Sequence, residues 1–261
     1  MQTEMELDKI YNEDCLIGMN KLPNESIDCV VCDCPYLLVG GGCSEGNYKT
    51  AKGHRQTSGV LNRQRTKHVS LSGALNDQID AVRAGKMFAN NSIEFADWLP
   101  DVYRVLKPDT HCYIMINSRN LMKLQQEAEK VGFKFQNLLV WNKRSATPNK
   151  FYMQGAEFIL MLRKGGERWV NDMGMSNILT VPNIIGKTNH PTEKPIALMR
   201  VFVEQSSKRG DIVLDPFMGS GSTALACIQA ERHYIGYEID PQYYDVAQKR
   251  INSASRQLTI F

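Results

Sequence analysis

The sequence lacks long apolar runs: none of its 261 residues belongs to a stretch near the roughly twenty that a membrane-spanning helix needs. We also expect no signal peptide, because the first residues are acidic and polar. Its seven cysteines form no paired framework, since their number is odd and they are scattered, several of them inside apolar stretches. We therefore expect buried free thiols and a soluble, cytoplasmic protein without a membrane or disulfide-scaffold role.

A metal-binding cluster is absent as well. Cys29, Cys32 and Cys34 lie close together in the sequence, but they belong to an extended run. Successive side chains of such a run point to opposite faces, so the three thiols cannot converge on one ion. We therefore expect no metal site.

Acidic residues are missing from one long segment. Residues 46–76 contain no Asp or Glu but six basic side chains, whereas the whole chain has a net charge of only +3 and a pI of about 8.4. The basic charge is thus concentrated in a polar insertion, residues 37–91, without regular periodicity. Solvated charge is one interpretation, and a clamp on a nucleic-acid backbone is the other. The candidate phosphate contacts are Lys49, Lys52, Arg55, Arg63, Arg65 and Lys67.

The turn Asp33-Cys34-Pro35-Tyr36 follows an apolar run, residues 26–32, that predicts a buried parallel strand. Sheets of α/β proteins place their chemistry at the carboxyl ends of such strands. The Asp33 carboxylate and the Cys34 carbonyl can accept the two hydrogens of an exocyclic amine. Pro35 fixes the turn, and Tyr36 offers a ring for stacking. The alternative is a capping Asp before a proline turn.

A glycine-rich turn lies near the other end of the sequence. Residues 211–214 predict a strand, and an alanine-rich helix follows the turn and continues to Ala230. The next strand, 234–237, ends at Glu238, roughly twenty residues further on, where an acid can hold a ribose. Because the third glycine of a dinucleotide motif is missing, the pattern favours an adenosyl cofactor. The turn reads Asp215-Pro216-Phe217-Met218-Gly219-Ser220-Gly221-Ser222-Thr223.

Hydrophobic periodicity predicts the remaining elements. Seven strands are expected, over residues 9–12, 26–32, 111–116, 138–141, 158–162, 211–214 and 234–237. Helices are expected over residues 15–22, 95–106, 121–131 and 196–205, with a kink or restart at Pro100. The final helix is expected to end near Ala254, leaving residues 255–261 as a tail.

These two turns, with His190-Pro191-Thr192-Glu193-Lys194-Pro195, resemble the motifs of the amino-group DNA methyltransferases. The catalytic motif of that family has the form Asp/Asn/Ser-Pro-Pro-Tyr/Phe. This chain departs from it at Cys34, whose proposed role belongs to its backbone carbonyl. The catalytic turn precedes the cofactor turn, as in the circularly permuted beta group of the family. Further matches, which in the family wall the target-base pocket, are Trp141-Asn142-Lys143 and Glu157-Phe158-Ile159-Leu160.

The resemblance implies a single methyltransferase domain over residues 1–261, with an α/β, circularly permuted Rossmann-like fold and a seven-stranded, mostly parallel sheet. Residues 168–189 would be a short target-recognition segment. It also implies S-adenosyl-L-methionine as the cofactor, with Asp14 beside the adenine and Glu238 at the ribose. The implied cofactor residues are Asp14, Cys15, Lys194, Asp215, Phe217, Met218, Gly219, Ser220, Gly221, Thr223 and Glu238.

The implied reaction is methylation of an exocyclic amine in double-stranded DNA, with the target base flipped out of the helix. Asp33 favours adenine, because family members with Ser at this position tend to modify cytosine. N4-cytosine methylation and a catalytically silent DNA-binding protein of the same fold stay open as alternatives. The resemblance further implies a bacterial or phage-encoded protein of the restriction-modification type, working at the nucleoid, and it leaves a homodimer open.

The last five residues, Gln257-Leu258-Thr259-Ile260-Phe261, carry three apolar side chains. The string is similar to the Gln-Leu-x-Leu-Phe peptide by which bacterial proteins attach to the replication sliding clamp. Such a peptide would enter an apolar groove of its partner. The alternative is that these residues fold back onto the domain.

Overall fold

The computed structural model describes residues 5–35, 48–49, 55–56, 93–147, 152–184 and 193–258. The chain divides into two compact units: the first comprises Met1–Pro35, Ile93–Arg144 and Ala156–Phe261, and the second comprises Tyr36–Ser92 and Ser145–Gly155. In the second unit, β3 (Tyr48–Lys49) pairs antiparallel with β4 (Arg55–Gln56). The rest of the insertion expected over residues 37–91 lies outside the described residues.

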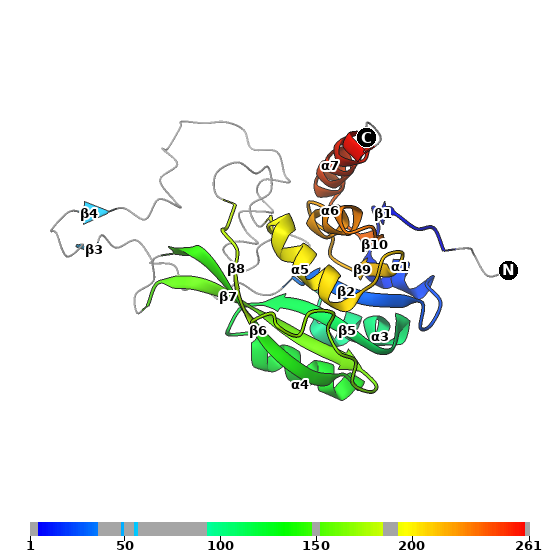
Figure 1. Ribbon diagram of the computed structural model, residues 1–261, viewed down its shortest axis with the longest axis horizontal. Coiled ribbons are helices and arrows are strands. Elements are labelled where there is room, and N and C mark those ends of the chain that lie inside the picture. Colours follow the sequence, from blue (N-terminus) through cyan, green and yellow to red (C-terminus); the bar gives the residue numbers. More distant parts are fainter. Residues whose placement is uncertain are drawn as a thin grey trace. The chain divides into compact units, whose positions relative to one another are not determined.

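An eight-stranded sheet organises the first unit, in the order β1-β10-β9-β2-β5-β7-β6-β8 (Figure 1). Most neighbours are parallel, whereas β7 runs antiparallel to β5. The expectation of seven strands is wrong, because the short strand β8 pairs with β6 inside the segment expected to be irregular. The strands are β1 (Lys9–Tyr11), β2 (Ile27–Asp33), β5 (Leu106–Ile116), β6 (Lys134–Thr147), β7 (Gln154–Lys164), β8 (Ile178–Thr180), β9 (Ile212–Asp215) and β10 (His233–Tyr237).

Strands from opposite ends of the chain lie side by side at the centre of this sheet. Cys29 of β2 is in register with Val213 of β9, and the two strands are parallel. In Figure 1 the blue β2 and the orange β9 are neighbours. Their carboxyl ends, Asp33 and Asp215, therefore leave the same edge of the sheet, as the permuted order predicted.

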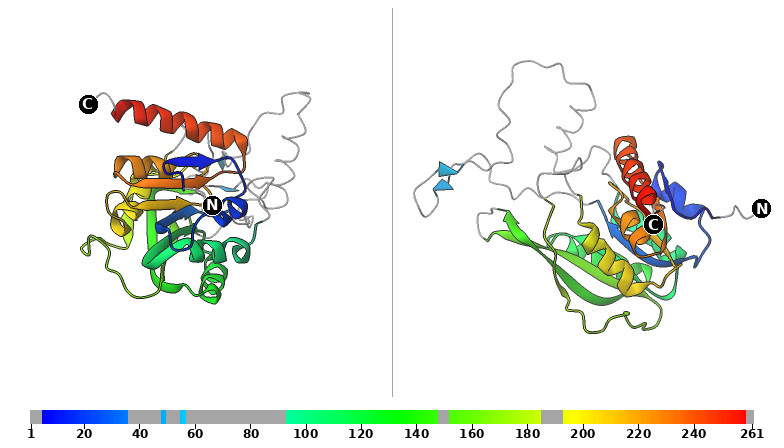
Figure 2. Two further views of the ribbon diagram at one scale, coloured as in Figure 1. Left: turned by 90° about the vertical axis from the view of Figure 1, so that its right-hand side faces the viewer. Right: turned by 45° about the horizontal axis from the view of Figure 1, so that its top comes forward.

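Helices cover both faces of the sheet (Figure 2), with α5 and α6 on one face and α1, α3 and α4 on the other. A kink or a restart was expected at Pro100, and the restart is wrong, since α3 runs through this residue as one helix. The last helix continues to Leu258, so residues 255–258 of the expected tail are helical, and residues 259–261 lie outside the described part. The helices are α1 (Cys15–Asn20), α3 (Phe95–Val105), α4 (Leu121–Val131), α5 (Ile196–Ser206), α6 (Ser222–Gln229) and α7 (Pro241–Leu258).

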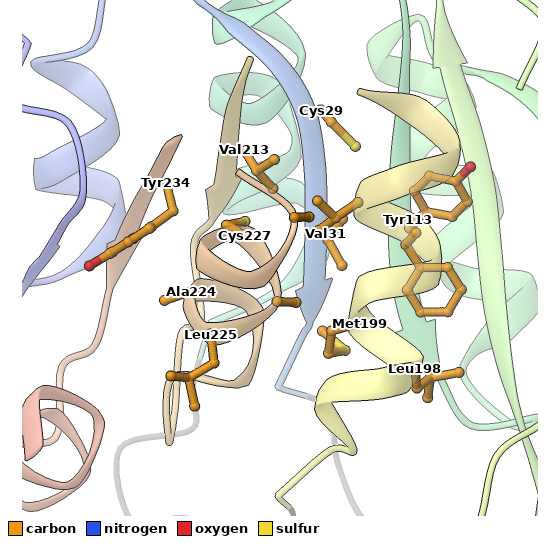
Figure 3. Close-up of a cluster of buried hydrophobic side chains, with 14 of the residues drawn as sticks. Cys29, Val31, Tyr113, Leu198, Met199, Val213, Ala224, Leu225, Cys227 and Tyr234 are labelled. Atoms are coloured by element: carbon orange, nitrogen blue, oxygen red, sulfur yellow. The ribbon is translucent and has the colours of Figure 1, made fainter. Parts of the chain in front are cut away.

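The core between the sheet and helices α5 and α6 is mainly apolar (Figure 3). Side chains of β2 such as Cys29 and Val31 are fully buried, and they face residues of the two helices such as Met199 and Cys227. Burial on both faces explains why residues 29–32 of β2 are continuously apolar rather than alternating. This packing makes β2 a rigid base for the turn that follows it.

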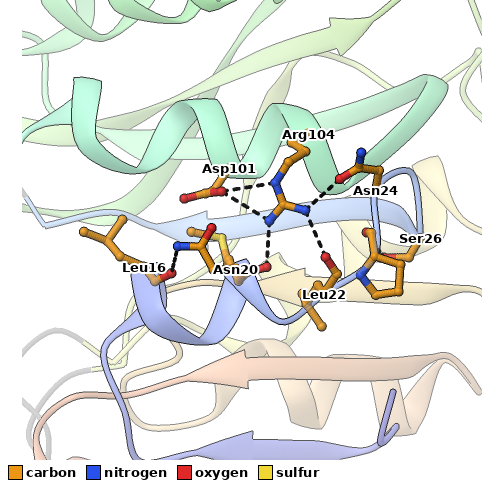
Figure 4. Close-up of polar contacts among 9 residues, drawn as sticks. Leu16, Asn20, Leu22, Asn24, Ser26, Asp101 and Arg104 are labelled. Atoms are coloured by element: carbon orange, nitrogen blue, oxygen red, sulfur yellow. Dashed lines mark hydrogen bonds and ion pairs between the residues drawn. The ribbon is translucent and has the colours of Figure 1, made fainter. Parts of the chain in front are cut away.

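On the opposite face, the Arg104 guanidinium binds the end of α1 and the loop between α1 and β2 (Figure 4). It donates to the carbonyls of Met19 and Leu22 at 2.8 and 2.9 Å, and to the Asn24 side chain at 2.9 Å. Asp101, one turn earlier on α3, accepts from the same group. Because helix carbonyls at a C-terminus lack partners within the helix, these bonds fix the end of α1 against α3.

Three findings on the described residues concern the cysteines, possible metal ligands and membrane-spanning helices. All six cysteines within them are free and buried, as expected. No group of three potential ligand side chains in the described ranges is placed to hold a metal ion. Likewise, none of the described helices is long and apolar enough to cross a membrane.

Candidate active site

Asp33 is the last residue of β2, and its carboxylate lies in a cluster of alternating charges. Lys194 Nζ is 2.8 Å from Asp33 Oδ2 and 3.3 Å from Glu157 Oε2. Lys143 Nζ contacts the other oxygen of Glu157 at 2.9 Å. The remaining oxygen, Asp33 Oδ1, is shielded from solvent and has no hydrogen-bond partner among the described residues. We call these four residues the charge chain.

The two carboxylates of the charge chain respond differently to their surroundings. Burial raises the pKa of Asp33, and the adjacent Lys194 only partly offsets this effect. Burial also acts to raise the pKa of Glu157, but Lys194 and Lys143 outweigh it and the pKa is lowered. Two cations against one carboxylate explain the difference. Glu157 is thus held ionised, while Asp33 depends on a single cation.

The residues after Asp33 form the turn predicted to be catalytic. Cys34 is buried, and its thiol lies 3.6 Å from the carbonyl of Met115 on β5, toward which it donates. Burial raises the pKa of this thiol well above its usual range, so the side chain is an unreactive packing group. Pro35 ends the described part of the turn, and Tyr36 lies outside the described residues.

The glycine-rich turn between β9 and α6 is tied together by two acids. Asp215 accepts from the Phe217 amide at 2.9 Å and from the Thr223 hydroxyl at 2.6 Å, and burial raises its pKa to about 7. Glu238, one residue past β10, accepts from the amides of Gly219 and Asp240 at 2.9 and 2.8 Å. Both acids therefore shape the backbone of the turn while each keeps free lone pairs.

Glycine is required in this turn for conformational reasons. Gly219 and Gly221 have φ of +55° and +83°, a region that residues with a Cβ rarely adopt. A Cβ on Gly221 would also lie 3.1 Å from that of Ala247 on α7. The backbone amides at the start of α6 are consequently left open to a ligand. Within the described part of the chain, the buried Ser222 hydroxyl at that helix start also has no partner.

Other predicted cofactor residues have local structural contacts. Asp14 caps α1 by accepting from the Leu16 amide at 2.8 Å, and Cys15 is buried, which raises its pKa to about 12. Met218 is buried, while the Phe217 ring meets Trp98 edge-on with ring centres 5.1 Å apart. Lys194, predicted at the cofactor, contacts the two acids of the charge chain.

Sequence reasoning missed the contacts made by Arg250 of α7. Its guanidinium donates to the Ser220 carbonyl at 2.6 Å and contacts Glu193 at 2.9 Å. It thereby joins the glycine-rich turn to the residue before Lys194. A single basic residue on a polar helix carries no motif signal, so only the fold reveals it. The roles of Glu157 as a partner of Lys194, and of Lys143 as a second partner of Glu157, were also unassigned, although both residues lie in matched motifs.

A family model described as DNA methylase, N6_N4_Mtase, matches residues 27–249. The chain belongs to this family. It is a DNA methylase by that match, with the fold and the permuted order of turns that the sequence predicted.

Curated relatives of this DNA methylase are Type II methyltransferases. M2.DpnII of Streptococcus pneumoniae is 26% identical over 265 residues, covering 94% of this chain and 89% of that protein. M.HinfI of Haemophilus influenzae is 27% identical over 272 residues, covering 94% of this chain and 68% of that protein. Both alignments therefore include the catalytic and the glycine-rich turns.

Solved structures share the fold. The M1.HpyAVI–SAM complex superposes with a TM-score of 0.63 at 25% identity, covering 93% of this chain and 98% of that one. The cytosine-N4-specific PvuII DNA methyltransferase gives a TM-score of 0.65 at 16% identity, covering 95% of this chain and 91% of that one. At 16% identity, the similarity to the PvuII enzyme supports a shared fold alone.

Proposed function

We propose that this DNA methylase transfers a methyl group from S-adenosyl-L-methionine to the exocyclic amine of adenine in double-stranded DNA, yielding N6-methyladenine at specific sites. The observation that carries the proposal is the shielded Asp33 Oδ1 at the end of β2, an acceptor without a partner among the described residues. A buried acceptor of this kind is costly unless a ligand donor satisfies it. An amine hydrogen is such a donor.

The glycine-rich turn fits the cofactor. Glu238 has lone pairs left for two ribose hydroxyls, and the first backbone amides of α6, which have no acceptor within the helix, suit a carboxylate or an adenosyl group. Asp14, at the start of α1, would lie by the adenine. A related structure, that of M1.HpyAVI, was solved as a complex with SAM. When bound, the cofactor supplies an electrophilic methyl group on a sulfonium.

The protein contributes positioning and electrostatics. The adenine amine is a poor nucleophile because its lone pair is delocalised into the ring. Hydrogen bonds from its two hydrogens to Asp33 Oδ1 and to the Cys34 carbonyl favour a pyramidal nitrogen with a localised lone pair. Since the Cys34 thiol points to Met115, its replacement of the family's proline leaves the carbonyl's role intact.

The base must leave the duplex to reach this site, and Tyr36 is proposed to replace its stacking partners. The six basic residues of the 46–76 segment are proposed to hold phosphates, a role compatible with their concentration in one stretch. Their side chains lie outside the described part. The reaction is proposed to take place in the cytoplasm, on DNA of the nucleoid.

The decisive experiment measures the methylated base. Product DNA from reactions with labelled S-adenosyl-L-methionine is digested and resolved by mass spectrometry, and N6-methyladenine is expected. Asp33→Ala is expected to abolish methylation while cofactor affinity, measured by calorimetry, stays within about twofold. Methylcytosine in the product, or full activity in Asp33→Ala, would overturn the proposal.

We also propose that residues 257–261 anchor the protein to a sliding clamp. Gln257 and Leu258 end α7, so the anchor would continue from a helix. A clamp pull-down compares the full chain with a version truncated after Arg256 and with Phe261→Ala. Retention of the full chain alone is expected, and equal retention of all three contradicts the anchor. Gel filtration of the full chain tests the homodimer separately.

A further inference from the structure

The charge chain links three separate parts of the first unit through one lysine. Lys194 precedes α5, Asp33 ends β2, and Glu157 lies on β7. The Lys194 side chain is only 10% exposed, and its Nζ lies within 3.3 Å of both carboxylates. A buried ammonium so placed is stabilised by its two acids, and losing it leaves the Asp33 carboxylate uncompensated and Glu157 with Lys143 alone.

Lys194 contacts one oxygen of the Asp33 carboxylate and makes no hydrogen bond to the other. Oδ2 is 2.8 Å from Nζ, whereas Oδ1 has no partner among the described residues. A carboxylate held at one oxygen cannot rotate freely, so the direction of its second oxygen is set. That second oxygen is the acceptor to which the proposed function assigns the target amine.

The backbone around Lys194 is itself fixed. The preceding Glu193 contacts Arg250, which donates to the Ser220 carbonyl of the glycine-rich turn at 2.6 Å. The following Pro195 is the N-cap of α5, with a φ of −59°. On the other side of the ammonium, Lys143 holds Glu157 at 2.9 Å. The lysine is therefore supported at both ends, as a precise site requires.

We infer that Lys194 is a positioning residue for methyl transfer, whose ammonium holds Asp33 Oδ2 so that Oδ1 is ionised and directed to accept a hydrogen of the target amine. This inference rests on the proposed function. It gives Lys194 a role at the base rather than at the cofactor, where the sequence placed it. Glu157 and Lys143 hold the ammonium in place.

The first test separates the base from the cofactor. Lys194→Met is expected to lower kcat between about tenfold and a hundredfold, the range for a misplaced catalytic group. Its affinity for S-adenosyl-L-methionine, measured by calorimetry, is expected to stay within about twofold of the wild type. Lys194→Arg is expected to recover much of kcat, because a guanidinium can also hold Oδ2. Loss of cofactor affinity with a normal pH profile would overturn the inference.

The second test uses the pH dependence of kcat/KM. Within the described residues, the groups facing Asp33 are Lys194, Glu157 and Asp215, with the neutral thiols of Cys32 and Cys34 alongside. Asp33 must be ionised to accept, so activity falls as pH drops through its pKa. Removing Lys194 raises that pKa, and Lys194→Met should shift the acid limb upward by about one pH unit or more.

Glu157→Gln is the matched variant for this profile. It keeps the shape of the side chain but removes the negative neighbour that raises the pKa of Asp33. Its acid limb is therefore expected to move to lower pH, opposite to that of Lys194→Met. Shifts of equal sign in both variants, or no shift in either, would contradict the inference.

An NMR titration that does not depend on activity tests the inference even if the proposed function fails or one variant does not fold. The Asp33 carboxyl carbon is titrated by NMR in the full chain labelled with ¹³C at aspartate, and Asp33→Asn assigns the signal. If the wild type makes no N6-methyladenine, the proposed function fails, but this titration still measures whether Lys194 lowers the pKa of Asp33. Equal midpoints in wild type and Lys194→Met overturn the inference. If Lys194→Met does not fold, Glu157→Gln and Lys194→Arg decide by the same titration.

Discussion

Gly221→Ala tests the glycine-rich turn most directly. Gly221 has a φ of +83°, and an alanine in that region costs about 1–2 kcal/mol. Its Cβ would lie 3.1 Å from the Cβ and 3.3 Å from the Cα of Ala247, inside ordinary contact distance. Overpacking of this kind costs a further 1–3 kcal/mol or so. The expected loss of unfolding free energy is therefore about 2–5 kcal/mol.

Gly210→Ala is the matched control. Gly210 has nearly the same φ, +81°, but no described atom lies within 4 Å of an added Cβ. Gly210→Ala has the same conformational cost as Gly221→Ala, about 1–2 kcal/mol, and the same effect on the unfolded chain. It lacks the close contact that Gly221→Ala makes with α7. Urea unfolding of both variants thus isolates the steric part, expected at about 1–3 kcal/mol.

The same pair separates cofactor binding from stability. Gly221→Ala is expected to weaken S-adenosyl-L-methionine binding about tenfold, or about 1.4 kcal/mol, because the shift of α7 moves the amides before α6. Gly210→Ala lies outside the turn and should leave affinity unchanged. Calorimetry measures both. Equal destabilisation by the two variants together with unchanged affinity would refute the packing argument.

Three further predictions concern single residues. Glu238→Ala should weaken S-adenosyl-L-methionine binding in calorimetry by about tenfold or more, since it removes the proposed ribose acceptors and the partner of the Gly219 amide; unchanged affinity would refute the assignment. Cys34→Pro should retain methylation activity, because the thiol packs on Met115 and the proposed role belongs to the carbonyl alone; an inactive Cys34→Pro that folds and binds cofactor would show that the thiol matters. Asp215→Asn should flatten the pH dependence of unfolding free energy between about pH 4 and 7. Burial raises the pKa of Asp215 to about 7, so its contribution is full below its unfolded pKa and lost as pH rises through 7. An unaltered slope in this variant contradicts that prediction.

The sequence predicted the elements that its hydrophobic pattern strongly marks. β2 and β9 are continuously apolar because both faces are buried, and the two turns at their carboxyl ends carry recognisable residues. Their order along the chain was enough to predict that the sheet is permuted. The strand β8 was missed because three residues at a sheet edge, only one of them buried, carry too little periodicity.

Helix ends were less predictable than helix positions. α7 extends to Leu258 although the residues after Ala254 are largely polar, since a surface helix continues for as long as its backbone bonds are made. Pro100 was expected to kink or restart α3, but α3 is one helix, and the buried residues Trp98, Leu99 and Val102 lie on both sides of the proline. At Pro100, tertiary packing outweighed local propensity.

The contacts of Lys194 show why a motif does not define a role. The motif places a lysine before α5, and either the cofactor or the catalytic turn could lie within its reach. The sheet brings the ends of β2 and β7 near each other, and this arrangement decides which group the lysine contacts. Asp33 and Glu157 are 124 positions apart in the chain, yet both contact the Lys194 ammonium. Sheet order, rather than local sequence, sets that convergence. A lysine at this position therefore makes the ionisation of the acceptor depend on correct assembly of strands from both halves of the chain.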